Sequence, residues 1–435
     1  MRQKTFYNEN FVSKKKFSAV SEDLECDIAV IGAGLAGLAL CFELSKHHAN
    51  VVLIDSGRIG DGASGLNGGF CSPGWSANEL VFYKKYGKDM ANIFASLSLE
   101  GLSWVKSFEK KEGFEEIDIR NGTMSLSLLT SENLGRKLFM QNIADKNLHE
   151  FISGSELQHY IGSRSYQYGV LSKQGFHFNP LEFLNALKIC AYNNSTRIFE
   201  NSKMIGFSES ESLCQVHVDT GYLIKCKKLV LATGGYGGAE LGFLASRWLP
   251  IKTFICTTSP MGKVIGNLIK QDLGFSDDRR AGNYFRRVGG DRLLWGRGIS
   301  ALGKTSLKKV SNDVQKDIKS FFPDLIEEIG GEKMLNIEYK WHGEMAYSFN
   351  MMPCVGQLSR RVFALTGFGG HGMNTAPIAS IILAEYLTGR SNRLSFFNKI
   401  ALQWNGWKFG RFIAETAYRL MGVQDRLKTI LIKYF

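Results

Sequence analysis

Three glycines, Gly32, Gly34 and Gly37, stand between an apolar run and an apolar helical pattern, and this spacing suits a ligand that carries phosphates. Residues 27–31 read as a short buried strand, and residues 38–44 read as the start of a helix. In such a unit the first glycine permits a tight turn, the second lets the backbone approach a pyrophosphate, and the third lets the helix pack against the strand. The free N–H groups of the first helical turn then face the phosphates.

A carboxylate at the end of the next strand completes a dinucleotide-binding pattern. Residues 51–54 are apolar throughout, and Asp55 follows them. It comes about 20 residues after the glycines, where an acidic side chain is expected to bind a ribose diol. This carboxylate would repel a 2′-phosphate, so the pattern disfavours NADP. The alternative is a glycine-rich turn in some other α/β protein, but strand, turn, helix, strand and acid in this order favour the dinucleotide site.

A second glycine-dense segment, residues 56–70, follows directly, and an NAD-dependent dehydrogenase would rarely need it. The stretch from Arg58 to Gly69 resembles the segment R-I-G-x-G-A-S-G-R-N-G-G of FAD-dependent amine and amino-acid oxidoreductases. These form part of the D-amino-acid oxidase superfamily, and the gamma-glutamylputrescine oxidase type is the most similar. Leu66 stands where that pattern has arginine. Further segments resemble the family in the same order along the chain: 122–126, 155–170, 177–181, 229–235, 249–260, 284–296 and 341–373.

The resemblance implies an α/β fold in which a Rossmann-like FAD-binding domain is interleaved with an α+β substrate domain built on a mixed sheet. It also implies FAD as the cofactor. We expect FAD to be bound noncovalently, because no cysteine occupies the C-terminal position that sarcosine oxidases use for attachment. The expected divisions are a loosely ordered polar leader (1–25), the FAD-binding domain (26–80, 165–240 and 341–390), the substrate domain (81–164 and 241–340), and a helical basic and aromatic C-terminal extension (391–435).

A third glycine-rich loop precedes an apolar helix expected at residues 378–387, with Pro377 near its start. A helix N-terminus carries partial positive charge, so it would stabilise negative charge at the N1–C2 edge of a reduced flavin. With the family resemblance, the three loops and two strand ends give these expected cofactor-binding residues: Gly32, Ala33, Gly34, Leu35, Ala36, Gly37, Asp55, Ser56, Arg58, Ala63, Ser64, Asn67, Gly68, Gly69, Met204, Thr233, Gly234, Gly367, Gly369, Gly370, His371, Gly372 and Met373.

Four side chains are candidates for catalysis or substrate contact. Arg286 would clamp a carboxylate, or form a surface salt bridge. Tyr347 would lie near the flavin face, or pack in the core. His371 has an unperturbed pKa near neutral, so it would relay protons, or it would hydrogen-bond the backbone. Lys252 would place a cation near flavin C4a–N5 and assist the reaction with oxygen. His177 is a weaker candidate, because its segment turns into a helix.

These features predict an FAD-dependent oxidoreductase that oxidises the CH–NH bond of an amine or amino acid by hydride transfer to flavin N5, with hydrolysis of the imine afterwards. The substrate would be a gamma-glutamylputrescine-like amine, a secondary amine or an amino acid, and oxygen or a quinone would accept the electrons. The alternatives are a D-amino-acid dehydrogenase that reduces a quinone, a flavin monooxygenase that uses NADPH, and a non-catalytic flavin-binding protein.

Composition limits the other partners. The chain of 435 residues has a net charge of +12, but its Lys and Arg are spread out, so we expect no nucleic-acid partner. The aromatic and basic stretch 404–435 suits either peripheral membrane contact or packing on the body of the protein. We find no apolar run of about 18 residues, no signal-peptide pattern and no CxxC pair among the eight cysteines. We therefore expect no metal site and a cytoplasmic, possibly membrane-associated protein.

Overall fold

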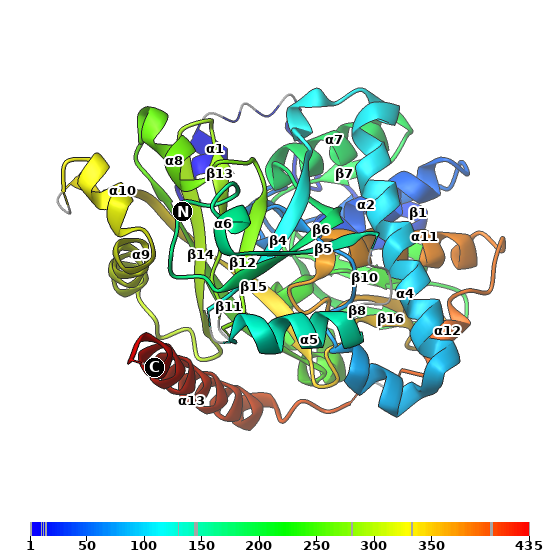
Figure 1. The fold of residues 1–435 in the computed structure, drawn as a ribbon. Helices are drawn as coiled ribbons and strands as arrows, with labels where there is room; N and C mark the ends of the chain where they lie inside the picture. Colours follow the sequence, from blue (N-terminus) through cyan, green and yellow to red (C-terminus); the bar gives the residue numbers. More distant parts are fainter. Residues whose placement is uncertain are drawn as a thin grey trace.

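Two β-sheets and the helices that cover them make up the chain in the computed structural model (Figure 1). The structure describes residues 2–434 except 10, 12, 14, 129, 143–146, 280–281, 332–333 and 401–402. Within this part of the chain, one sheet has eight strands and the other has nine. The predicted fold class, an α/β unit interleaved with a second unit on a mixed sheet, is confirmed.

The eight-stranded sheet consists of β1 (Leu24–Ile31), β2 (Val51–Ile54), β7 (Arg197–Phe199), β8 (Met204–Glu209), β9 (Cys214–Val218), β10 (Leu223–Leu231), β16 (Cys354–Gln357) and β17 (Val362–Thr366). Its main order is β16-β17-β10-β1-β2-β7, and the pairs from β17 to β7 are parallel. The hairpin of β8 and β9 joins β10 in antiparallel fashion. Because parallel strands end at the same edge, the turns after β1, β2, β10 and β17 gather there.

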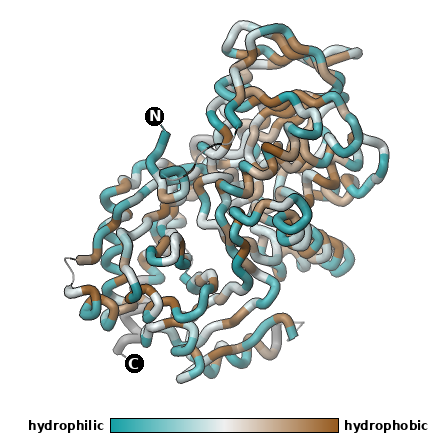
Figure 2. The backbone as a smooth tube through the Cα atoms, turned by 90° about the horizontal axis from the view of Figure 1, so that it is seen from above, coloured by the Kyte–Doolittle hydropathy of each residue, from teal (hydrophilic) through white to brown (hydrophobic). Residues whose placement is uncertain are grey.

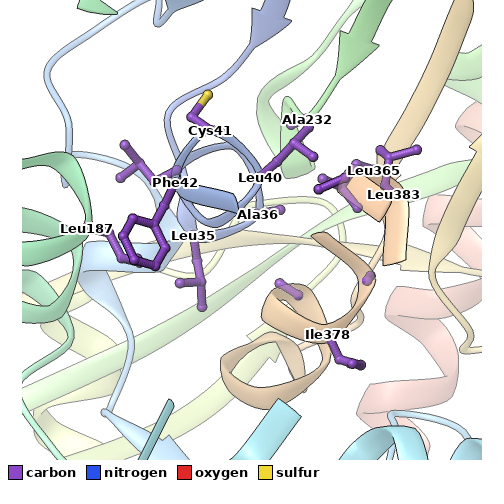
Figure 3. Close-up of a cluster of buried hydrophobic side chains, with 14 of the residues drawn as sticks. Leu35, Ala36, Leu40, Cys41, Phe42, Leu187, Ala232, Leu365, Ile378 and Leu383 are labelled. Carbon is purple, nitrogen blue, oxygen red and sulfur yellow. The ribbon is translucent and has the colours of Figure 1, made fainter. Parts of the chain in front are cut away.

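Three helices cover one face of this sheet: α2 (Leu35–Ser45), α7 (Pro180–Asn193) and α11 (Gly372–Leu387). Figure 3 shows apolar side chains from all three in one cluster, among them Phe42, Leu187 and Ile378. Nearly every residue of α2 is buried, since it lies between the sheet and the other two helices. The long helix α4 (Glu79–Glu112) packs on the outer side of α11.

The nine-stranded sheet consists of β3 (Phe70–Cys71), β4 (Arg120–Ser127), β5 (His149–Ser153), β6 (Tyr168–His177), β11 (Trp248–Thr258), β12 (Gly274–Asp277), β13 (Tyr284–Val288), β14 (Arg292–Ser300) and β15 (Ile337–Ser348). Its main order is β15-β11-β14-β13-β12-β4-β6-β3, with β5 paired to β6. The sheet is mixed, because β12 runs parallel to β4 and the other pairs are antiparallel.

The two helices α9 (Leu307–Phe321) and α10 (Pro323–Glu328) contribute to the hydrophobic core of this second unit. Phe285 and Trp295 stack at its centre with ring centroids 4.5 Å apart. Along the tube of Figure 2, hydrophobic stretches run through the interior and hydrophilic ones lie mainly at the periphery. The opposite face of the sheet is therefore the one that meets the turns of the first unit.

The remaining α-helices are α1 (Phe6–Glu9), α3 (Ala63–Leu66), α5 (Glu132–Asn142), α6 (Gly154–Leu157), α8 (Ile265–Leu268), α12 (Ser395–Asn398) and α13 (Trp407–Tyr434), and the 3-10 turns are η1 (Glu115–Ile117), η2 (Gly234–Tyr236), η3 (Ala239–Ser246) and η4 (Gly262–Val264). No helix in the described part of the chain combines the length and the apolar character needed to cross a membrane.

Two predicted domain limits do not coincide with the sheets. Strand β6 lies within the segment 165–240 that we assigned to the FAD-binding domain, yet it pairs with β3, β4 and β5 in the nine-stranded sheet. Strand β15 starts before residue 341 and also belongs entirely to that sheet. Alternating apolar residues identify a strand but do not show which sheet it joins. The sequence therefore did not determine to which domain β6 and β15 belong.

Several described residues of the predicted leader make specific contacts with the rest of the chain. The Gln3 side chain donates to the His342 carbonyl (2.8 Å) and accepts from the His342 N–H (3.0 Å), and Tyr7 on α1 is buried. Arg2 forms an ion pair with Asp61 at 2.7 Å. The aromatic side chains of Phe6 and Tyr7 pack against Tyr339 and Trp341 of the nine-stranded sheet, which the polar composition of this segment did not indicate.

Helix α11 begins earlier than predicted. It starts at Gly372, so Pro377 lies inside the helix, in its second turn. The glycine-rich loop therefore turns into the helix without an intervening stretch, and the first N–H groups of α11 belong to loop residues.

A glycine sets the distance between α4 and α11. A Cβ atom at Gly101 would lie 2.2 Å from the Asn374 carbonyl oxygen. We expect Gly101→Ala to force the two helices apart and to lower the free energy of unfolding by about 1–3 kcal/mol. Urea denaturation would measure this, with Lys106→Ala on the exposed side of the same helix as the control. Equal stability of the two variants would contradict this account of the packing.

Candidate functional site

A cavity of about 620 Å³ lies where the strand ends of the first sheet meet the face of the second. All three glycine-rich loops line it, together with residues of β11, β13, β14 and β15. This volume is within the range of small-molecule sites, about 300–1,000 Å³. The cavity is thus large enough for a cofactor and is walled by both units of the protein.

The first glycine loop leaves room for a ligand on one side only. Gly32 has a φ of +106°, and a Cβ there would lie 2.6 Å from the Ala232 carbonyl oxygen. A Cβ at Gly37 would lie 1.9 Å from the Gly32 carbonyl oxygen, so α2 packs directly on the turn. Gly34 faces the cavity, and a Cβ there would meet only the Ser64 hydroxyl. The start of α2 is therefore open to a ligand at Gly34.

Asp55 lies at the end of β2 and lines the cavity. Its carboxylate accepts hydrogen bonds from the Ala33 and Gly57 N–H groups, both at 2.8 Å. Burial raises the pKa of this carboxyl, and the two N–H groups act in the opposite direction. Asp55 thus ties the glycine turn to the loop after β2, and its contact with a ribose stays a prediction.

Arg286 does not line the cavity. Its buried guanidinium donates to the Gly68 carbonyl (2.7 Å), the Phe178 carbonyl (2.8 Å) and the Tyr7 hydroxyl (3.1 Å). It also lies 3.3 Å from Nδ1 of His177. The predicted carboxylate clamp is therefore corrected: the donors of Arg286 hold the second glycine loop against β13, and this burial was not visible in the sequence.

Lys252 is also outside the cavity lining. Its ammonium forms an ion pair with Glu344 at 3.3 Å, across the β11–β15 pair. The next residue, Thr253, is the one that lines the cavity. Because side chains alternate along a strand, Lys252 points away from the site, which corrects the predicted role next to the flavin.

His371 and Tyr347 do line the cavity, at the third glycine loop. Nε2 of His371 lies 3.2 Å from the Ser72 carbonyl and 3.3 Å from the Pro73 carbonyl, so this nitrogen carries a proton. Burial lowers the pKa of His371, which keeps the ring neutral. His371 therefore holds the loop after β3, which is the structural alternative that we had weighed against a proton relay.

The third loop is fixed to both units. The Gly369 N–H donates to the Ala346 carbonyl (2.8 Å) on β15, and the Ser76 hydroxyl donates to the Gly369 carbonyl (2.8 Å). The first residues of α11, Gly372 and Met373, line the cavity. The positive end of the α11 dipole is thus directed to the same space as the positive end of α2.

Tyr284 is a lining residue that the sequence reasoning missed. Its ring lies across the backbone of β14, where a Cβ at Gly296 would come within 1.9 Å of it. Burial raises the pKa of both Tyr284 and Tyr347, so both phenols are protonated at neutral pH. Side chains two residues apart on a strand lie on the same face. Tyr284 therefore shares a face of β13 with Arg286, and this rule could have identified it from the sequence.

Nearly all the predicted cofactor residues line this cavity; the exceptions are Gly37 and Gly69, which lie behind the first and second loops. Of the four catalytic candidates, Tyr347 and His371 line it and Arg286 and Lys252 do not. The residues present fit an extended dinucleotide such as FAD, since the Gly34 cradle lacks a side chain and two helix starts offer N–H groups to its charged parts.

The comparisons with known proteins agree with this geometry. The family model described as DAO, FAD dependent oxidoreductase, matches residues 27–386. A probable oxidoreductase OrdL of Haemophilus influenzae is 25% identical over 97% of this chain and 96% of its own length. A gamma-glutamylputrescine oxidoreductase of Escherichia coli is 26% identical over 88% of each chain. The crystal structure of glycine oxidase from Geobacillus kaustophilus has a TM-score of 0.70 and 17% identity, covering 87% of this chain and 99% of that one.

The open side of the first glycine loop leads to a prediction about the cofactor. We expect Gly34→Val to fill the cradle and to abolish retention of FAD through purification, measured by the flavin absorbance per protein. Gly206→Val is the control, because a Cβ at Gly206 on β8 meets nothing within 4 Å. A yellow Gly34→Val protein with full occupancy would show that the pyrophosphate lies elsewhere.

His177 makes stability depend on pH. Burial, with the nearby Arg286, lowers its pKa to about 3 from an ordinary 6.5. As the pH falls, the unfolded chain therefore binds a proton at His177 before the folded chain does. The free energy of unfolding decreases below about pH 6.5, by about 3 kcal/mol at pH 4.5.

Urea unfolding at pH 7 and pH 4.5 tests this. Between the two pH values, we expect the free energy of unfolding of His177→Gln to fall by about 3 kcal/mol less than that of the wild type. The exposed His217→Gln is the control and should keep the wild-type difference. An unchanged pH dependence in His177→Gln would contradict the assignment of this proton.

Proposed function

Because the chain belongs to the family of FAD-dependent oxidoreductases, we propose that it oxidises the CH–NH bond of an amine or amino acid. The observation that carries this proposal is a continuous cavity that joins a dinucleotide cradle to a chamber walled by β-sheet. The likeness to a gamma-glutamylputrescine oxidoreductase supports an amine substrate. When bound, FAD supplies the flavin N5 that accepts a hydride from the substrate carbon.

The three loops would hold FAD noncovalently. Gly32 to Ala36 and Asp55 would bind its pyrophosphate and ribose, and residues 63–68 and 367–373 would contact its flavin. Burial raises the pKa of the Cys354 thiol to about 12, and that of the Cys71 thiol well above its usual value. Because a thiolate is the reactive form of cysteine, neither residue is suited to a covalent attachment.

The chain's own residues would position the substrate and exclude water. Tyr284 and Tyr347 offer neutral hydroxyl groups, and the start of α11 offers partial positive charge where negative charge develops. Positioning then supplies much of the rate, and the imine hydrolyses in water after release.

A specific observation favours an amine over an α-amino acid. Among the described residues, Arg297 is the cation that lines the cavity on the side of the nine-stranded sheet, and it is ion-paired with Asp317 on α9. A substrate carboxylate would have to compete with that partner. We therefore propose a gamma-glutamylputrescine-like or secondary amine as the substrate, with oxygen or a quinone as the electron acceptor.

Anaerobic reduction of the FAD-loaded protein tests the proposal. We expect an amine to bleach the flavin band and D-amino acids to leave it unchanged, in a panel of polyamines, gamma-glutamyl amines, N-methyl amino acids and D-amino acids. Bleaching by D-amino acids alone would favour the dehydrogenase alternative, and reduction by NADPH would favour a monooxygenase. A fully loaded protein that no panel member reduces would contradict oxidation of these amines.

Tyr347 gives this proposal a residue-level test. Removing one hydrogen bond to a bound amine costs about 0.5–1.5 kcal/mol, so Tyr347→Phe should lower the reduction rate constant or the amine affinity by about 2- to 13-fold. The exposed Tyr222→Phe is the control. Wild-type reduction kinetics in Tyr347→Phe would show that this hydroxyl does not contact the substrate.

A further inference from the structure

Helix α13 has an exposed apolar stripe. Large hydrophobic side chains recur at helical spacing along its outer side, and Phe409 is 80% exposed. The stripe consists of Phe409, Phe412, Ile413, Leu420, Val423 and Leu427. Residues at this spacing share one face of a helix, and the exposed Thr416 lies between the two halves of the stripe. An exposed apolar face on one helix indicates an interaction surface.

The opposite side of α13 is bound to the nine-stranded sheet by polar contacts. The buried carboxylate of Glu415 accepts from the Ser300 hydroxyl (3.2 Å) and from the N–H groups of Ala301 (2.8 Å) and Leu302 (3.1 Å). Arg411 donates to the Ala301 carbonyl at 2.8 Å. These contacts fix which face of the helix points outward.

Two further helices carry exposed apolar side chains. Figure 1 shows α5, α13 and the first turns of α4 along its lower edge. Leu134, Leu138 and Met140 of α5 are exposed, as are Leu80 and Val81 of α4. The three elements are far apart in the sequence, so their shared edge is a product of the fold. We call these exposed side chains and the α13 stripe the lower face.

Positive charges outnumber negative charges on this face. The 28 residues of α13 contain six Lys or Arg and two acids, Glu415 and Asp425. Both acids are buried, whereas Arg419 is exposed. On the other elements, the exposed lysines Lys84, Lys85 and Lys88 of α4 and Lys137 of α5 outnumber the exposed acids Glu79 and Asp89 of α4. Apolar side chains flanked by cations complement an anionic lipid surface.

The lower face lies beside one end of the cavity. Leu249 on β11 is paired with Tyr347, and its side chain lies close to Gly410 of α13. On the other side, the Ser76 hydroxyl holds the third glycine loop just before α4 begins. The chain segments that carry the lower face therefore flank the part of the cavity lined by Tyr347.

We propose that the lower face docks on an anionic membrane surface, with the α13 stripe inserted among the lipid headgroups. This docking goes beyond the proposed function and does not depend on it. It would bring the Tyr347 end of the cavity towards the bilayer. A quinone dissolved in the membrane would then reach the protein on that side, a consequence that does rest on the proposed function.

Flotation of the FAD-loaded protein with lipid vesicles tests the docking. We expect binding to vesicles of phosphatidylcholine with 30% phosphatidylglycerol, about tenfold or more tighter than to phosphatidylcholine alone, and weakening with salt. The combined variant Phe409→Ser, Phe412→Ser and Ile413→Ser should lower the affinity at least about tenfold. Arg419→Glu should weaken only the binding to anionic vesicles.

A control variant removes exposed apolar residues elsewhere: Ile205→Ser, Met334→Ser and Tyr222→Ser together. This variant should bind vesicles as the wild type does, and thermal unfolding and flavin content should show that both triple variants are folded. Absence of wild-type binding to anionic vesicles, or equal loss in both triple variants, would overturn the proposal. So would light scattering that shows a wild-type dimer which the α13 variant alone converts to monomer, since the stripe would then bind a second copy of this chain.

Discussion

The placement of the cavity depends on one buried cation. Arg286 lies on the nine-stranded sheet, but its guanidinium reaches the carbonyls of Gly68 and Phe178 and the hydroxyl of Tyr7. A buried charge is tolerated only when its donors find acceptors, so the second glycine loop and the N-terminal segment must stay where those acceptors are. The two sheets are thereby held at a fixed spacing, and the space left between them is the cavity.

Backbone, rather than side chains, forms much of the cofactor end of this cavity. The glycines of the first loop allow α2 to begin within reach of a ligand, and α11 begins within the third loop in the same way. Both helices belong to one layer, and α4 closes on α11 at Gly101 without a side chain between them. Close helix packing and an open phosphate cradle are thus two results of the same absence of Cβ atoms.

The substrate end has a different character. Tyr284, Tyr347, Met345 and Ile299 line it from the face of the sheet, and the lining cation Arg297 is ion-paired with Asp317. Such a chamber binds through shape and neutral hydrogen bonds. On the outer side of the same unit, α13 buries its two acids and leaves large apolar side chains exposed to solvent.

The sequence by itself determined the dinucleotide unit, because the glycines, the apolar strands and Asp55 act through local geometry and short spacings. Nearly all the predicted cofactor residues line the cavity for that reason. The roles of Arg286, Lys252 and Tyr284 were decided only by the tertiary structure. Their types were visible in the sequence, but their orientations depend on strand register and on partners far away in the chain, such as Tyr7 and Glu344. The membership of β6 in the second sheet has the same origin, since long-range pairing is not encoded in the alternation of a single strand.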